Sequence, residues 1–150
     1  MTVPTHSAFG MLLAYLLSFL PWWIIAPLAY LSHYLLDLCP HWEKDLAFFL
    51  QGNKRRLQIA TLVELLLAIA LYAFAWWQGW KEFSFLAAAI AAGFPDIKHL
   101  HPFLESLPLN GWHEKAHCWW QKNPKRENEG GPSFQLFFII IFVIFVLTRG

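Results

Sequence analysis

A long apolar run at residues 57–77 constrains the fold of this chain more than any other feature. Only Gln58, Thr61 and Glu64 interrupt it. A helix needs about 20 apolar residues to cross a bilayer, so the run predicts a transmembrane helix over residues 57–78. Of all residues, 57% are hydrophobic and only 14% are charged, whereas soluble domains carry about 25% charged residues. The sequence therefore predicts an integral membrane protein.

Four shorter apolar runs predict further helices, over residues 8–20, 24–38, 83–94 and 134–147. Pro21 separates the first two, which we expect to form a helical hairpin with short or tilted legs. A polar region at residues 97–132 precedes the last run. The expected fold is all-α: a single polytopic membrane bundle of about five helices over residues 1–150, several of them short.

Lysines and arginines gather at one end of this predicted bundle. If every predicted helix crosses, the N-terminus, residues 41–56 and residues 97–132 share one side, and most basic residues lie there. The positive-inside rule makes that side cytoplasmic, so we expect an inner-membrane protein whose polar region faces the cytoplasm. Tryptophans flank the predicted helices at both ends, as in an aromatic belt. Those on the other side are Trp22, Trp23, Trp76, Trp77 and Trp80.

His33, Asp37 and His41 recur at four-residue intervals, a spacing that puts side chains on one face of a helix. An imidazole and a carboxylate within an apolar segment are costly to bury unless something compensates them. A metal ion would do so, because neutral His and ionised Asp are both zinc ligands. A hydrogen bond between His33 and Asp37 is the alternative. Glu64, about two turns below the cytoplasmic end of its helix, would reach toward the same face.

A second pair, His113 and His117, brackets Glu114 with the same spacing. The segment satisfies the H-E-x-x-H pattern of zinc metalloproteases. No third-ligand motif follows it, so a metalloprotease is an alternative rather than the favoured interpretation.

The order of these motifs resembles that of the uncharacterised membrane-bound metal-dependent hydrolases. This family is grouped with a LexA-binding, inner-membrane-associated hydrolase and is distantly similar to zinc-dependent phospholipase C and the single-strand-specific zinc nucleases. The resemblance spans residues 5–117, although Lys98 stands where many members carry a second acidic residue. The motifs that carry it are Thr5-His6-Ser7, Ser32-His33-x3-Asp37-x2-Pro40-His41, Gly93-x-Pro95-Asp96 and His113-x3-His117.

The resemblance implies a centre of about two or three divalent ions, which would activate a water. We expect zinc, with manganese or iron as alternatives. Asp37 and Asp96 are the candidate bridging carboxylates, and with Glu64 they form the candidate catalytic set. The candidate ligands are His6, His33, Asp37, His41, Glu64, Asp96, His113 and His117.

Basic residues near this face are candidates to neutralise a substrate phosphate. The alternative is that they set the topology beside anionic lipid. They are Arg55, Arg56, Lys98 and Lys115.

The sequence thus favours a membrane-bound hydrolase that cleaves a phosphoester, such as a phospholipid or lipid phosphate, at the membrane interface. Lipid is the expected environment and candidate substrate, and the net charge of +1 argues against nucleic acid as a partner. One alternative is a di-iron membrane oxygenase, which also uses histidines and carboxylates. Another is a non-enzymatic metal transporter or membrane scaffold, although the far halves of the helices lack the ionisable residues that a transporter needs.

Overall fold

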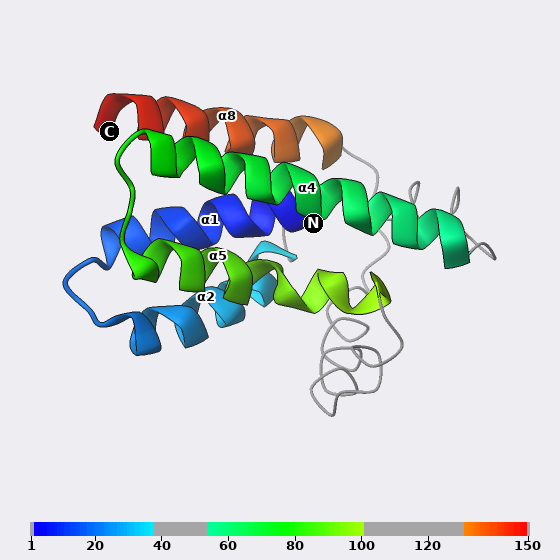
Figure 1. Ribbon diagram of the computed structural model, residues 1–150, viewed down its shortest axis with the longest axis horizontal. Coiled ribbons are helices and arrows are strands. Elements are labelled where there is room, and N and C mark those ends of the chain that lie inside the picture. The colour runs from blue at the N-terminus through cyan, green and yellow to red at the C-terminus, as the bar shows by residue number, and fades with distance from the viewer. Residues whose placement is uncertain (1, 38–53, 101–130, 150) are drawn as a thin grey trace.

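The computed structural model of the chain describes residues 2–37, 54–100 and 131–149 (Figure 1). Every regular element within these ranges is a helix, so the expected all-α fold is confirmed for this part of the chain. The elements are α1 (Val3–Leu16), α2 (Trp22–Leu36), α4 (Lys54–Trp77), α5 (Phe83–Gly93), the 3-10 helix η1 (Phe94–Leu100) and α8 (Gly131–Arg149).

Helix α1 lies at the centre of the bundle and contacts α2, α4, α5 and α8 (Figure 1). Its closest neighbour is α5, and small residues explain how near the two helices come. A Cβ atom added at Gly10 would lie 2.5 Å from the carbonyl oxygen of Ala88 and 2.9 Å from the Cβ of Ala92. The glycine therefore sets the spacing between α1 and α5.

Helix α1 begins earlier than the apolar pattern indicates. The prediction placed its start at residue 8, whereas the structure starts it at Val3 and ends it at Leu16. Pro4 is tolerated in the first turn, where its missing N–H is not needed. The amides of Thr5 and His6 donate to the carbonyl of Thr2 at 3.0 and 3.2 Å. The prediction was wrong here because buried polar residues extend the helix beyond the apolar run.

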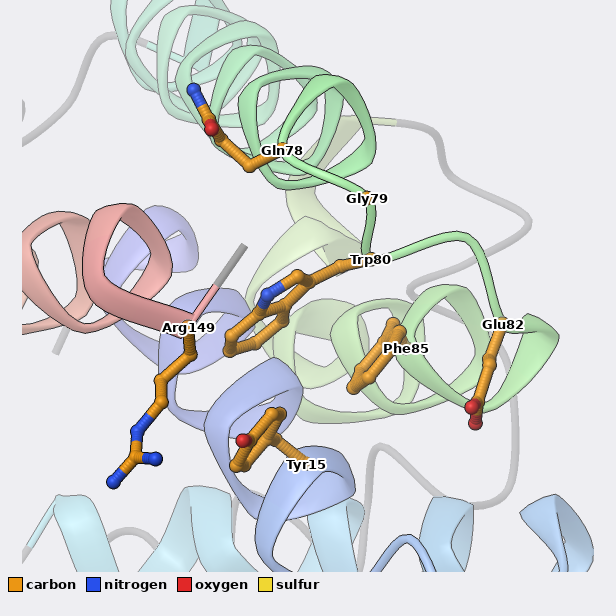
Figure 2. Close-up of a pocket in the computed structure, with 7 residues that line it drawn as sticks. All are labelled: Tyr15, Gln78, Gly79, Trp80, Glu82, Phe85 and Arg149. Atoms are coloured by element: carbon orange, nitrogen blue, oxygen red, sulfur yellow. The ribbon is translucent and has the colours of Figure 1, made fainter.

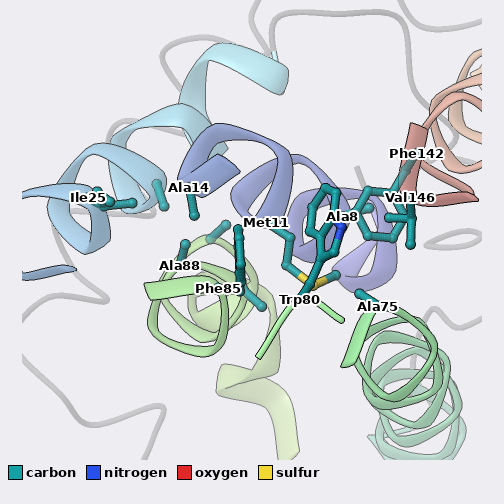
Figure 3. Close-up of a cluster of buried hydrophobic side chains, with 13 residues drawn as sticks. Ala8, Met11, Ala14, Ile25, Ala75, Trp80, Phe85, Ala88, Phe142 and Val146 are labelled. Carbon is teal, nitrogen blue, oxygen red and sulfur yellow. The ribbon is translucent and has the colours of Figure 1, made fainter. Parts of the chain in front are cut away.

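One apolar cluster forms the core between α1, α2, α4, α5 and α8 (Figure 3). Trp80, in the turn after α4, is only 4% exposed. Its ring stacks on Tyr15 with centroids 5.0 Å apart and meets Phe142 edge-on. Trp80 is therefore a core residue rather than part of an interfacial belt, whereas Trp77 is 84% exposed, as a belt residue would be.

One described helix is long and apolar enough to span a membrane. It covers Arg55–Trp77, with a mean hydropathy of 2.1, and only 17% of that apolar window is buried inside the bundle. The apolar stretches Phe83–Ile97 and Gln135–Arg149 are shorter. Length and composition thus identify one candidate span among the described residues.

Candidate metal centre

Two histidines and two aspartates meet where α1 begins, α2 ends and η1 follows α5. His6 lies at the end of the first turn of α1, and His33 lies in the last turn of α2. Asp37 is the residue that ends α2, and Asp96 lies in η1. The four-residue spacing of His33 and Asp37 thus places both side chains at this end of the bundle. The packing of α1 and η1 against α2 brings His6 and Asp96 to the same place.

Each carboxylate turns one oxygen toward each histidine. The Nε2 atom of His6 lies 3.2 Å from Asp37 Oδ1 and 3.5 Å from Asp96 Oδ2. The Nε2 atom of His33 lies 3.2 Å from Asp37 Oδ2 and 3.6 Å from Asp96 Oδ1. Both carboxylates therefore bridge the two imidazoles, and they use different oxygens to do so.

The backbone of α5 fixes which nitrogen of His33 faces the carboxylates. Its Nδ1 lies 2.9 Å from the carbonyl oxygen of Ala92. A carbonyl only accepts hydrogen bonds, so Nδ1 carries the proton and donates it, which leaves the lone pair of neutral His33 on Nε2. Metal-binding histidines are commonly oriented in this way. The bond also joins the end of α2 to the end of α5.

The two histidines are enclosed and stacked on one another. Both are 0% exposed, and their ring centroids lie 3.9 Å apart with an angle of 26° between the planes. The Asp37 side chain is 3% exposed and that of Asp96 is 16% exposed. Of the four side chains, Asp96 therefore has the most access to solvent.

The ring nitrogens of His6 are enclosed by the bundle. The side chain is fully buried near the start of α1 and stacks on the ring of His33. Neither ring nitrogen of His6 makes a well-oriented hydrogen bond to a described residue, although Nε2 lies close to both carboxylates. Burying such atoms is costly, and a cation bound between them would offset that cost.

The spacing of the ligand atoms fits a divalent ion. One ligand atom each from His6, His33 and Asp96 lies within 4.8 Å of the others. Two ligands bound tetrahedrally to zinc at ~2.1 Å would lie ~3.4 Å apart. The four nitrogen–oxygen distances in the cluster run from 3.2 to 3.6 Å. The donor set, two imidazoles and two carboxylates, is also one that zinc, manganese and iron accept.

The other candidate residues divide into two groups. Glu64 is half-buried in α4, and its Oε2 accepts a hydrogen bond of 3.2 Å from the backbone N–H of Val3. Arg55 and Arg56 are exposed at the start of α4. Lys98 lies within η1. The candidates that lie outside the described residues are His41, His113, Lys115 and His117.

Two backbone partners of the site escaped the sequence analysis. The Ala92 carbonyl holds His33, and the Val3 amide meets Glu64. Backbone groups occur in every residue, so no pattern of side chains marks them. Only the packing of α1 and α2 against α5 and α4 creates these contacts.

A separate cavity of about 370 Å³ lies at the other end of the bundle, near the end of α8 (Figure 2). Its one carboxylate, Glu82, accepts a hydrogen bond of 3.2 Å from the Ser84 hydroxyl. No histidine or cysteine lines it, so its lining does not offer a metal-binding set. The lining residues are Tyr15, Gln78, Gly79, Trp80, Glu82, Phe85 and Arg149.

Comparisons of the chain with protein families, curated proteins and solved structures find no match. The resemblance to the membrane-bound hydrolases therefore rests on the sequence motifs themselves.

Proposed function

We propose that this chain is a membrane-bound metal-dependent hydrolase of a phosphoester, related to the hydrolases whose motifs it resembles. The observation that carries the proposal is the buried cluster of His6, His33, Asp37 and Asp96, in which each carboxylate offers one oxygen to each imidazole. Carboxylates that bridge in this way are typical ligands of paired metal ions.

In this proposal the four side chains hold two divalent ions. His6 and His33 would supply imidazole nitrogens, and Asp37 and Asp96 would supply carboxylate oxygens shared between the ions. A small set of protein ligands would leave room for water and substrate, as in catalytic zinc sites. A paired metal site supplies an activated water and stabilises the oxygens of an in-line displacement. Asp96 is the most solvent-accessible of the four side chains, so substrate would approach the site from the side on which Asp96 lies.

The exposed surface of α4 supports a membrane location. The core helix of a soluble protein is mostly buried, whereas large apolar side chains of α4 such as Leu62, Leu66 and Ile69 are about half exposed. Exposed apolar surface of this extent is stable in lipid rather than in water. We propose that the remaining helices also lie within the membrane and that the metal centre faces the cytoplasm, on the basis of the lysines and arginines at that end.

The position of the site supports a lipid as the proposed substrate. The exposed Arg55 and Arg56 begin α4, which also contacts the η1 segment that carries Asp96. Guanidinium groups at a membrane interface bind phosphate oxygens well. A phospholipid or lipid phosphate would thus bring its phosphate to the metal centre from the membrane surface.

The same carboxylate arrangement suits a di-iron centre, so an oxygenase is the second candidate function. The identity of the bound metal separates the two. Bound zinc or manganese supports the hydrolase, whereas bound iron together with oxygen consumption supports the oxygenase.

Phosphate release from lipid substrates tests the proposal. Detergent-purified protein loaded with zinc or manganese is mixed with phosphatidic acid or a phospholipid in micelles. We expect wild-type protein to release inorganic phosphate from phosphatidic acid or the phosphorylated head group from a phospholipid. Asp96→Asn should lose at least ~100-fold in rate, since even changes behind a metal ligand cost about 10–100-fold. Glu82→Ala, at the other end of the bundle, is the control and should retain activity. Equal rates in wild type and Asp96→Asn would contradict the proposal.

A further inference from the structure

Helix α1 lacks a cap of its own. The side chain of Thr2, the residue before the helix, contacts the Thr5 hydroxyl at 3.0 Å and caps no backbone amide. No acidic residue occupies the first turn, and Pro4 contributes no N–H. The backbone amide of Val3, a residue that is 1% exposed, is therefore a donor that needs a partner from elsewhere.

Glu64 supplies that partner from another helix. Its Oε2 lies 3.2 Å from the Val3 nitrogen. A carboxylate at a helix N-terminus also interacts favourably with the helix dipole. Glu64 thus caps α1 from α4, although it lies 61 positions along the chain from Val3.

The capped turn carries a residue of the metal centre. His6 follows Val3 by three positions, so the two residues are neighbours on the helix surface. The amide of His6 donates to the Thr2 carbonyl at 3.2 Å within the same turn. Helix α4 also contacts η1, which holds Asp96. Helix α4 therefore contacts both the start of α1 and η1, the segments that carry His6 and Asp96.

We propose that Glu64 is a positioning residue that acts through α1, rather than a metal ligand. It holds the first turn of α1 so that Nε2 of His6 keeps its distance from Asp37 and Asp96. Its Oε2 accepts the hydrogen bond from the Val3 amide at 3.2 Å, so this oxygen is engaged at the start of α1. This inference rests on the proposed metal centre.

The test compares Glu64→Ala, which removes the acceptor, with Glu64→Gln, which keeps an acceptor oxygen without the charge. Hydrogen exchange of metal-free protein reports on the cap, and Zn²⁺ competition with a chelating dye reports on the site. We expect Glu64→Ala to exchange faster in the first turn of α1 and to bind the wild-type number of ions about 10-fold more weakly. Glu64→Gln should restore the affinity and leave the visible spectrum of bound Co²⁺ unchanged.

Gln58→Ala, in the same helix, is the matched control and should behave as wild type. Loss of an ion or an altered Co²⁺ spectrum in Glu64→Gln would overturn the inference, because it would make Glu64 a ligand. Unchanged exchange and affinity in Glu64→Ala would overturn it as well. The exchange measurement needs no metal. If wild-type protein shows slow exchange in the first turn of α1 but binds no Zn²⁺, the cap is present and the proposed function is overturned.

Discussion

At the scale of single residues, the most unusual feature is a group of acceptors that face one another. When His33 is neutral, its lone pair is on Nε2 because Nδ1 donates to Ala92, and this Nε2 lies 3.2 Å from a carboxylate oxygen. Neither ring nitrogen of His6 makes a well-oriented hydrogen bond to a described residue, and its Nε2 lies 3.2 Å from the other oxygen of the same carboxylate. Neutral imidazoles and carboxylates at this spacing need a proton or a cation between them, and a buried cation satisfies all four side chains together.

Removing the metal should therefore destabilise the fold. A ligand present at 100 times its dissociation constant stabilises the folded state by about 2.7 kcal/mol. We expect a strong chelator to lower the thermal unfolding midpoint of wild-type protein in detergent, and re-addition of Zn²⁺ to restore it. Asp37→Asn removes a bridging charge and should show no such shift. A chelator that leaves the wild-type midpoint unchanged would argue against bound metal.

At the scale of elements, close packing of α1 on α5 holds the site together. Gly10 lies one turn after His6, on the helix that meets the Ala92 segment. The hydroxyl of Ser7 donates to the carbonyl of Ala89 at 3.1 Å across the same interface. The spacing of these two helices therefore governs how far His6 lies from Asp96.

Gly10→Ala should separate the two helices. Its Cβ would meet backbone atoms of Ala88, which have little room to move. Overpacking of this kind costs about 1–3 kcal/mol, and we expect that loss in the free energy of unfolding, together with weaker Zn²⁺ binding. Ile90→Ala trims a side chain of α5 that is 57% exposed and serves as the control with little change in either quantity. Wild-type stability in Gly10→Ala would show that the helices are not so closely packed.

The elements also show what sequence reasoning can reach. The apolar runs predicted the helices, and the spacing of His33 and Asp37 predicted a shared helix face, because both signals are local. The start of α1 was missed because it depends on buried partners of Thr5, His6 and Ser7. The burial of Trp80 was missed because Tyr15 and Phe142, its ring partners, are distant in the chain. Contacts between residues that are distant in the chain cannot be predicted from a local sequence pattern.

At the scale of the whole molecule, the two ends of the bundle differ in chemistry. One end carries the metal-binding set, and the other carries the cavity near Trp80 and Arg149, whose lining has no histidine (Figure 2). The apolar surface of α4 runs between them. Our proposal assigns the first end to the cytoplasm, by the positive-inside rule.

Labelling in intact cells tests this orientation. In a chain whose Cys39 and Cys118 are replaced by serine, single cysteines are introduced as Glu82→Cys and Arg55→Cys, both at exposed positions. We expect a membrane-impermeant thiol reagent to label Glu82→Cys in intact cells and Arg55→Cys only after permeabilisation. The reverse pattern would place the metal centre on the outer face, and labelling of both in intact cells would contradict a transmembrane α4.

The metal content of the purified protein tests the central claim most directly. Wild type, Asp37→Ala and Glu82→Ala are purified in detergent without chelator and analysed by mass spectrometry. The proposed centre predicts ~2 zinc or manganese ions per chain in wild type and in Glu82→Ala, and loss of both ions in Asp37→Ala because that carboxylate bridges them. Wild-type protein without stoichiometric metal, or Asp37→Ala with the full wild-type content, would contradict the metal centre.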